Sequence, residues 1–444
     1  MFCFIRRVGL NRLSAGLKLG VGATLLLSAC SVTDPAEETQ SSAPGDGTVT
    51  VLGVIVGAEQ ANLEAALAPF EEETGIEVVY EGTDAFTTLL PVRVDSGEAP
   101  DIAMFPQPGL MKSLARAGEL VPLDEVLERP ALEAAYGDTW LDLGTVDGEL
   151  YGIWYRAAVK SLVWYSPEEF EQRGYAVPET WDEMLALSDR IVADGGNPWC
   201  LGLESGNATG WPGTDWVEDI LLRTAGPEYY DRWVEHEVPF NDEPVQAAFR
   251  YFGEIVHSDG YVWGGKVGAL SIPWGDAPQG LFNSPPDCFM YRQGNFVTNF
   301  FPDDVGLGET IDVFVLPSID PEYGAPMLVA GDVFAMLNNT PEARALMAYL
   351  ATPTAHEIWA ERGGFLSAHQ QLDPAVYPDA LSRKLGELLT EAEIVRFDGS
   401  DSMPGAVSTG TFWSGMMDFV AGSSAEEVTD TIERNWPETR TATE

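Results

Sequence analysis

The sequence is poor in basic residues and histidine, and each shortage argues against a class of function. Only 24 Lys and Arg stand against 70 Asp and Glu, so the formal net charge is -46 at pH 7. Such a field repels phosphate backbones and anionic lipid surfaces, which argues against nucleic-acid binding. None of the four histidines is at ligand spacing to another: His236, His257, His356 and His369. Because His and Cys clusters are the usual signature of a metal site, we expect neither a metal nor a cofactor.

The apolar N-terminal segment is too short to cross a membrane. It covers residues 19–29 after four basic residues and no acidic one, whereas a membrane span needs roughly 20 apolar residues. A basic region before a short apolar one is typical of a secretory signal. Leu27-Ser28-Ala29-Cys30 resembles the lipobox of bacterial lipoproteins, in which the cysteine is lipidated. We therefore expect a signal peptide over residues 1–29 and an extracytoplasmic protein anchored to the cell membrane through Cys30. A cleaved soluble protein and an uncleaved anchor are the alternatives.

Cysteine is also scarce, with four in the chain. Cys3 lies in the leader and Cys30 is the expected lipid site, which leaves Cys200 and Cys288. An oxidising extracytoplasmic compartment favours a disulfide between these two residues.

Acidic and aromatic residues are abundant. Without the four basic residues of the leader, the exported part carries -46 - 4 = -50. Most of this acidity is interpreted as solvation of the surface, and a part as groups that hold hydroxyl-rich or cationic ligands. With 45% hydrophobic and 11% aromatic residues the chain is globular, since disordered chains are depleted in these types. Its length suits two domains of roughly 100 to 200 residues each.

Strands and helices alternate after a polar spacer. Residues 31–47 are dense in Ser, Thr, Pro, Gly and acids, which is typical of a flexible linker. Apolar patterns predict strands at 48–57, 76–80 and 101–105, with a helix at 59–74 and another capped by Asp84 that runs to about residue 96. This alternation predicts βαβ units and a mostly parallel sheet. Ligands sit at the carboxyl ends of such strands, which places residues 57–59, 83–86 and 105–108 along one rim.

The later part of the chain holds more candidate ligand residues. Residues 151–167 are predicted to leave the first lobe and enter a second, and residues 341–360 to form a helix. Trp211 and Trp216 flank Asp215 in a stretch with Pro and Gly, which marks a loop. Indole faces pack on a pyranose while carboxylates accept its hydroxyls, although core packing is the alternative for each tryptophan. Asp332 stands in an apolar stretch, so it is either a cap or a site residue.

The order of segments resembles a known family, the maltose-binding-protein-like substrate-binding lipoproteins of ABC sugar importers, over roughly residues 49–436. The markers are FEEETGI at 70–76, GEAPDI at 97–102, LVWY at 162–165, PETWDE at 178–183, VLP at 315–317 and Met403-Pro404 ahead of Phe412-Trp413. A second set of motifs resembles the alpha-glucoside-binding branch: Trp211-Pro212, Asp215-Trp216, Cys200 with PPDC at 285–288, Arg292-Gln293 and AGD at 330–332.

The resemblance implies an α/β, two-lobed periplasmic-binding-protein-like fold, with a ligand cleft between lobes that are joined by crossing strands and close like a hinge. Residues 48–160 and 327–365 are assigned to lobe 1, and residues 161–326 and 366–436 to lobe 2. Residues 30–47 form the linker and 437–444 a tail. The implied function is capture of a carbohydrate, an alpha-glucoside, and its delivery to ABC permease subunits in the membrane by a monomer.

Site residues follow partly from this resemblance. The family's aromatic rim position falls on Phe105, with Gln107 beside it, and its C-terminal stacking tryptophan falls on Trp413. The other stacking tryptophan of the family is absent, because Gly294-Asn295-Phe296 stands there. The full set of expected ligand-binding residues is Glu59, Asp84, Phe105, Gln107, Tyr155, Lys160, Trp211, Asp215, Trp216, Arg292, Gln293, Asn295, Asp332, Phe365 and Trp413.

The alternatives are a secreted glycoside hydrolase lipoprotein and an adhesive or structural lipoprotein. A hydrolase needs two carboxylates roughly 5 to 10 Å apart across the scissile bond. No local signature sets two acids apart, and the chain has no nucleophile motif of the Gly-x-Ser-x-Gly kind. The sequence therefore favours a binding protein without catalytic activity.

Overall fold

The structure is a computed structural model that describes residues 47–392 and 394–437. The expected signal peptide, Cys30, most of the linker and the last seven residues lie outside the described residues. No helix within the two described ranges is long and apolar enough to span a membrane.

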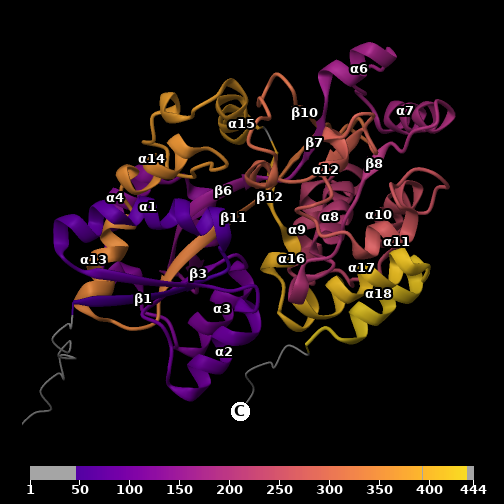
Figure 1. Ribbon diagram of the computed structural model, residues 1–444. Helices are drawn as coiled ribbons and strands as arrows, with labels where there is room; N and C mark the ends of the chain where they lie inside the picture. Colours follow the sequence, from indigo (N-terminus) through magenta and orange to yellow (C-terminus); the bar gives the residue numbers. More distant parts are fainter. Residues whose placement is uncertain (1–46, 393, 438–444) are drawn as a thin grey trace, which may run out of the picture. The chain divides into compact units, whose positions relative to one another are not determined.

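Two sheets organise the described part of the chain (Figure 1). The first has the strand order β12-β11-β3-β1-β2, with β6 also paired to β11. Its β1 is parallel to β2 and β3, whereas β11 is antiparallel to β3 and β6. Its strands are β1 (Thr48–Gly53), β2 (Glu77–Gly82), β3 (Ile102–Phe105), β6 (Gly152–Val159), β11 (Met327–Met336) and β12 (Val395–Phe397).

The predicted βαβ order is present in this first sheet. Helix α1 (Gly57–Thr74) ends where Gly75 takes a left-handed conformation, and α2 (Phe86–Ser96) ends in the same way at Gly97. Figure 1 shows α1 and α14 on one side of β1 and β3, and α2 and α3 on the other. The further elements are α3 (Pro108–Ala117), η1 (Leu123–Glu125), α4 (Arg129–Ala135), α5 (Asp138–Leu143), β4 (Thr145–Val146), β5 (Glu149–Leu150), α13 (Pro341–Leu350), α14 (Pro353–Arg362), η4 (Pro374–Val376) and α15 (Ala380–Glu391).

The helix predicted at 341–360 is two helices. Thr352 is extended, with φ -96° and ψ 151°, and α14 restarts at Pro353. Proline disfavours helical geometry at the residue before it and lacks the N–H that a continuous helix needs. The break follows from Pro353 alone.

The second sheet has the strand order β10-β7-β9-β8 and is surrounded by helices. Its strands are β7 (Leu162–Tyr165), β8 (Trp199–Cys200), β9 (Met290–Arg292) and β10 (Asp312–Val315). The surrounding elements are α6 (Pro167–Arg173), α7 (Trp181–Ala193), η2 (Gly206–Ala208), α8 (Trp211–Ala225), α9 (Pro227–Val234), α10 (Glu243–Val256), α11 (Gly265–Ser271), α12 (Gln279–Phe282), η3 (Asn295–Phe300), α16 (Gly399–Ser402), the π-helix η5 (Ala406–Phe412), α17 (Trp413–Ala421) and α18 (Ala425–Arg434).

We call the first sheet with α1 to α5 and α13 to α15 the first lobe, and the second sheet with α6 to α12 and α16 to α18 the second lobe. The chain passes between the sheets from β6 to β7, from β10 to β11 and from β12 to α16. The last passage differs from the assignment of 366–436 to lobe 2. Strand β12 pairs with β11 of the first sheet, and Leu366 forms a bridge with Ala157 on β6. Helix α15 also contacts the second sheet, since Lys384 lies 3.5 Å from Asp312 on β10. The last passage into the second lobe therefore follows Phe397.

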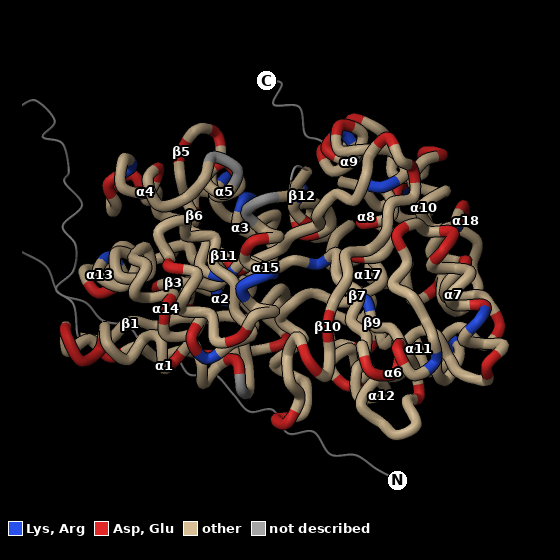
Figure 2. The backbone as a smooth tube through the Cα atoms, turned by 90° about the horizontal axis from the view of Figure 1, so that it is seen from above, with Lys and Arg blue, Asp and Glu red and all other residues tan. Residues whose placement is uncertain are grey.

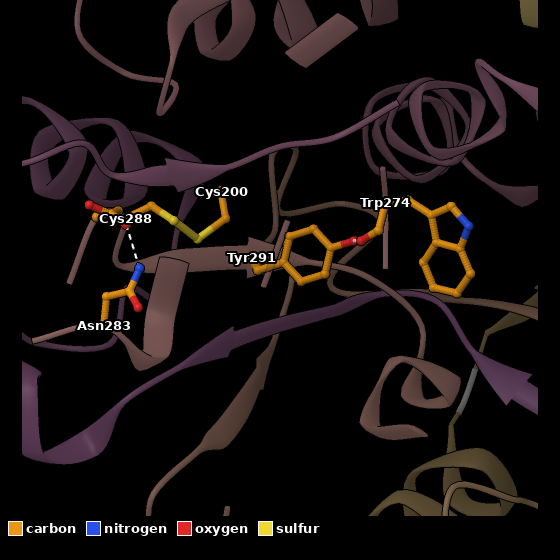
Figure 3. Close-up of a disulfide and its surroundings, with 6 residues drawn as sticks. Cys200, Trp274, Asn283, Cys288 and Tyr291 are labelled. Atoms are coloured by element: carbon orange, nitrogen blue, oxygen red, sulfur yellow. Dashed lines mark hydrogen bonds between the residues drawn. A yellow bond between two sulfur atoms is a disulfide. The ribbon is translucent and has the colours of Figure 1, made fainter. Parts of the chain in front are cut away.

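The predicted disulfide between Cys200 and Cys288 is confirmed, with Cα atoms 5.3 Å apart. It joins β8 to the segment just before β9 (Figure 3). Acidic residues are spread over helices of both lobes, for example α1 and α13 in the first and α9 and α18 in the second (Figure 2).

Candidate ligand-binding cleft

A cavity of about 430 Å³ lies between the lobes, within the roughly 300 to 1,000 Å³ of small-molecule sites. The first lobe contributes the segment after β1, the loop after β3, and the paired strands β6 and β11. The second lobe contributes the start of α8, the segments around η2 and η3, the start of α16 and the first residue of α17. The carboxyl ends of β1 and β3 therefore form part of the rim, as the parallel-sheet argument predicts.

Arg156 anchors the first group of charges in the cavity. Its Nε donates to Asp332 Oδ2 at 2.6 Å and its Nη1 to Glu59 Oε1 at 2.5 Å. Arg156 and Asp332 are direct partners in the β6–β11 ladder, so strand register brings them together. Asn299 also donates to Glu59 Oε1, at 3.2 Å. The buried acid in the apolar stretch 327–334 thus has its partner on the neighbouring strand.

Lys160 anchors the second group. It lies four residues beyond Arg156 and on the same face, because side chains alternate along a strand. Its Nζ donates to Asp215 Oδ1 at 3.0 Å and to Asp398 Oδ2 at 2.5 Å. The ammonium also lies 5.1 Å from the centroid of the Trp211 ring, within the range of a cation–π contact. Lys160 therefore links the end of β6 to Asp215 on α8 and to Asp398, which lies between β12 and α16.

The two acids that share Lys160 have opposite pKa shifts. Burial raises the pKa of Asp215 to about 7, although the charge of Lys160 opposes the shift. Burial also acts to raise the pKa of Asp398, but the charge and hydrogen bond of Lys160 outweigh it and lower this pKa to about 2. Asp398 has the shorter contact with Lys160 and accepts further hydrogen bonds from Ser400 Oγ and from the backbone N–H of Asp401. Hydrogen bonds to the charged form hold a carboxylate ionised.

Two further carboxylates line the cavity without a protein partner. The predicted cap of α2 is not Asp84: Ala85 is the N-cap residue, and Thr83 Oγ1 accepts the N–H of Ala85. Within the described part of the chain, the carboxylates of Asp84 and Asp401 take part in no hydrogen bond or ion pair. Burial and the nearby charge of Asp398 raise the pKa of Asp401. Both groups are free to accept hydrogen bonds from a ligand.

Aromatic rings from the second lobe form one wall of the cavity. Trp211 lies edge to face with Trp274 at 5.3 Å, and Phe296 and Phe300 pack against Trp274 at 5.7 and 4.6 Å. The Tyr291 hydroxyl donates to the carbonyl of Trp274 at 2.6 Å, which links this wall to β9 beside the disulfide (Figure 3). No sequence motif marks Trp274 as a ligand residue, because its place in the wall depends on the tertiary contact with Tyr291.

Trp413 and Gln107 carry buried polar atoms without a partner among the described residues: the indole N–H of Trp413 and Oε1 of Gln107. Both side chains line the cavity. An unsatisfied buried polar group costs about 1 to 3 kcal/mol, so a ligand that pairs with it gains affinity. Trp413 follows the π-helical turn η5, and such turns are frequent at functional sites. A Cβ at Gly210 would lie 2.2 Å from the Trp413 carbonyl oxygen, so Gly210 permits this close approach.

The cavity brings together eight of the fifteen residues expected from the sequence: Glu59, Asp84, Gln107, Lys160, Trp211, Asp215, Asp332 and Trp413. The other seven do not line it: Phe105, Tyr155, Trp216, Arg292, Gln293, Asn295 and Phe365.

Each of these seven is held in a structural role. Phe105 packs edge to face on Phe86, and Phe365 packs on Tyr155, whose hydroxyl donates to the Ala355 carbonyl in the first core. Three of the other four support the second lobe: Trp216 packs between Trp199 and Phe252, Arg292 pairs with Asp219, and Gln293 accepts the N–H of Gly294. The fourth, Asn295, accepts the N–H of Val159 at the end of β6, where the chain crosses between the lobes.

The stretch 211–216 is the beginning of α8 and not a loop. Proline is favoured in the first turn of a helix, where its missing N–H is not needed, so Pro212 was the available signal. Because residues 211–216 are helical, the two indoles point in different directions: Trp211 lines the cavity and Trp216 lies in the core.

The residues that sequence reasoning missed include Arg156, Asp398, Asp401 and Trp274. Arg156 could have been found by its spacing from Lys160 on one strand face, whereas the other three depend on tertiary contacts. No group of His, Cys, Asp and Glu within residues 47–392 and 394–437 is arranged to hold a metal ion.

Comparison with known proteins gives relatives over nearly the whole described part. A family model described as bacterial extracellular solute-binding protein matches residues 56–357. The osmoprotective compounds-binding protein GgtB of Synechocystis sp. is 59% identical over 389 residues, 88% of this chain and 92% of the relative. The alpha-glucosides-binding periplasmic protein AglE of Rhizobium meliloti is 42% identical over 397 residues, 88% and 87%. The solved structure of the solute receptor AcbH, described with a preference for β-D-galactopyranose, has a TM-score of 0.77 at 21% identity and covers 88% of this chain and 97% of its own.

Proposed function

Because the chain belongs to the bacterial extracellular solute-binding protein family, we propose that it captures an alpha-glucoside between its lobes and delivers it to an ABC permease in the membrane. The family and the two-lobed α/β fold expected from the sequence are confirmed. The proposed ligand class is supported by the relative AglE, an alpha-glucosides-binding protein that is 42% identical to this chain.

One observation carries the proposal: the cavity combines an aromatic wall with carboxylates and unpaired polar atoms from both lobes. A sugar presents an apolar ring face and many hydroxyls, which suit stacking and convergent hydrogen bonds. Trp274 and Trp413 supply aromatic surface, whereas Asp84 and Gln107 supply acceptors.

Calorimetric titration with maltose, trehalose and neutral monosaccharides tests the ligand class. We expect saturable binding of at least one alpha-glucoside, and a ligand at 100 times its dissociation constant should raise stability by about 2.7 kcal/mol in a thermal-shift assay. Glucose should not be released, since the proposed function involves no hydrolysis. Failure of every alpha-glucoside to bind, or steady release of glucose, contradicts the proposal.

Hinge closure of the lobes is part of the proposal. The chain crosses between the sheets near residues 159–162, 315–327 and 397–399, and such crossings allow one lobe to rotate on the other. Solution scattering should give a smaller radius of gyration with saturating sugar. An unchanged radius would show that the lobes do not move on binding.

We also propose that the mature protein is a monomer tethered through a lipid on Cys30. Replacing Cys30 with Ala should release the protein from the membrane fraction. Retention of Cys30→Ala in that fraction contradicts the lipid anchor. Sedimentation of the soluble variant then gives its oligomeric state.

A further inference from the structure

The charged groups that line the cavity are strongly unbalanced. Six carboxylates and two cationic side chains contribute to its wall: Glu59, Asp84, Asp215, Asp332, Asp398 and Asp401, and Arg156 and Lys160. The acidity of the whole chain does not explain this excess, because Asp215, Asp332 and Asp398 are each 3% exposed or less. Acids that only solvate a surface are not buried in this way.

Neither cation is available as a free counter-ion for a ligand. Arg156 is 11% exposed at its side chain and is held by Glu59 and Asp332. Lys160 is 6% exposed and is held by Asp215 and Asp398. With these four acids ionised, Arg156 and its two carboxylates have a net charge of -1. Lys160 also pairs with two carboxylates, one of which, Asp215, lies 3.5 Å from Arg292 as well. An anionic group that approached either cation would meet two carboxylates already in place.

The remaining two carboxyl groups of the cavity belong to Asp84 and Asp401. Asp84 and Asp401 have no hydrogen bond or ion pair within the described ranges, and both line the cavity. They can accept hydrogen bonds from hydroxyl or ammonium groups, and bonds to a charged acceptor are roughly twice as strong as neutral ones. They cannot bind a second carboxylate or a phosphate without a proton or a cation between them.

From this arrangement we infer that the cavity selects against negative charge: it binds neutral or amine-bearing glycosides and rejects uronides and sugar phosphates. The inference rests on the proposed function, since it names the kind of glycoside that the same cavity accepts. Juxtaposed like charges are a common means of excluding a wrong partner.

The test uses three ligands that share one skeleton. The better binder of maltose and trehalose is compared with derivatives whose C6 hydroxymethyl group is replaced by an aminomethyl group or by a carboxylate. Calorimetric titration at pH 8 should find the amine at least as tight as the parent sugar and the uronide weaker by about 100-fold or more. Exclusion by shape alone would weaken both derivatives to a similar degree and would overturn the inference.

A pair of variants identifies the groups responsible. Asp84→Asn combined with Asp401→Asn keeps the shape of both side chains and replaces both carboxyl groups by neutral amides. We expect it to reduce the ratio of parent to uronide affinity by about tenfold or more. The matched control is Asp95→Asn with Glu171→Gln, which removes two exposed charges outside the cavity, one in each lobe, and should leave the ratio unchanged.

Each outcome is decisive. Parent and uronide affinities within threefold of each other overturn the inference and leave the proposed function intact. An equal change of the ratio in both variants shows an effect of overall charge and also overturns it. If no alpha-glucoside binds at all, the proposed function itself fails. The amine and uronide titrations use the unaltered protein, so they decide the matter even where the double variant does not fold.

Discussion

The two lobes build their sides of the cavity in different ways. The first lobe supplies mainly strand ends and strand faces: the segment after β1, Gln107 after β3, and the facing β6 and β11. The second lobe supplies tryptophan rings and buried acids from helix starts and loops, with Trp211 and Asp215 on α8 as the clearest case. A backbone hydrogen-bond ladder positions the first set, and side-chain packing positions the second.

This difference predicts different effects of substitution. In the second lobe the cavity side chains other than Asp401 are also packing or ion-pair residues, so their loss should change stability and affinity together. In the first lobe Asp84 and Gln107 follow strands β2 and β3, whose positions are set by backbone hydrogen bonds and not by these two side chains. Their loss should therefore change affinity alone. The predictions below start with the largest expected effect.

Removal of the disulfide should be the most damaging change in the second lobe. Cys200 and Cys288 are 88 residues apart in sequence, and closing a loop of this length is worth about 4 to 5 kcal/mol in the chain-entropy account. Denaturant unfolding of Cys200→Ser/Cys288→Ser should show this loss. Affinity should fall as well, because Tyr291 on β9 holds the carbonyl of Trp274. A double variant as stable as the parent would show that β8 and β9 are fixed without the bond.

Tyr291→Phe is the control for the path from the disulfide to the cavity. It removes the hydrogen bond to Trp274 and leaves the disulfide in place, so affinity should fall with a much smaller loss of stability. Unchanged affinity in Tyr291→Phe would place the effect of the disulfide elsewhere.

Breaking the ion pairs of Lys160 should cost nearly as much. Lys160→Met leaves Asp398 buried without its cation and Asp215 with only the longer contact to Arg292 at 3.5 Å, and breaking a buried pair typically costs about 3 to 5 kcal/mol. Chemical unfolding at pH 7 measures it. Adding Asp215→Asn and Asp398→Asn to the same chain removes the uncompensated charges and should restore most of the stability. No recovery in the triple variant would mean that Lys160 acts through packing and not through charge.

The same difference between the lobes explains what the sequence could predict. The βαβ order, the strand at 101–105 and the rim position of Gln107 follow from hydrophobic pattern and from the rule that ligands sit at strand ends. Asp332 was identified because a buried acid in an apolar strand needs a partner. Its partner Arg156 was missed, because register between β6 and β11 is a property of the sheet and not of either segment.

The residues that differ from their expected place are those whose position depends on packing. Phe105 was expected at the rim by resemblance, but its ring packs against Phe86 in the first core. Arg292 has the chemistry of a ligand residue, yet Asp219 holds it in the second lobe. Asp398 and Asp401 reach the cavity only because the chain crosses back after β12, a crossing expected some thirty residues earlier. No local pattern encodes these contacts.

Trp413 should show a large effect on affinity with a moderate effect on stability. Truncation to Ala removes aromatic contact and an unpaired indole N–H, and losses of about 2 to 4 kcal/mol are usual for such aromatic residues. Binding should weaken by roughly one to three decades. Trp181→Ala is the comparison, since Trp181 donates to Glu254 and packs on Tyr251 away from the cavity. Calorimetry should find its folded fraction nearly unchanged in affinity, and the reverse ranking would contradict the location of the site.

Asp215 should give the second lobe a pH-dependent stability. Its folded pKa is about 7, above the ordinary value of 3.8, so the folded state binds more protons between these two values. Stability from this group is therefore lost as pH rises from about 4 to 7, with a slope of at most about 1.4 kcal/mol per pH unit. The charges that face it are Lys160 just after β6, Arg292 on β9 and Asp398 just after β12. Asp215→Asn should flatten this part of the profile, and an unaltered profile would show that the carboxyl is ionised throughout.

Asp84 should give the smallest effect and the clearest contrast with Asp215. Its carboxylate is exposed and has no hydrogen bond or ion pair within the described residues, so Asp84→Asn should leave the free energy of unfolding within about 0.5 kcal/mol of the parent. In the complex the same substitution replaces a charged acceptor by a neutral amide, and the difference between the two kinds of hydrogen bond is about 1 kcal/mol, or roughly fivefold in affinity. Paired thermal and calorimetric measurements on Asp84→Asn and Asp215→Asn compare one chemical change in the two lobes. If Asp84→Asn lowers stability as much as affinity, the first lobe is not a frame independent of its ligand groups, and the contrast between the lobes is wrong.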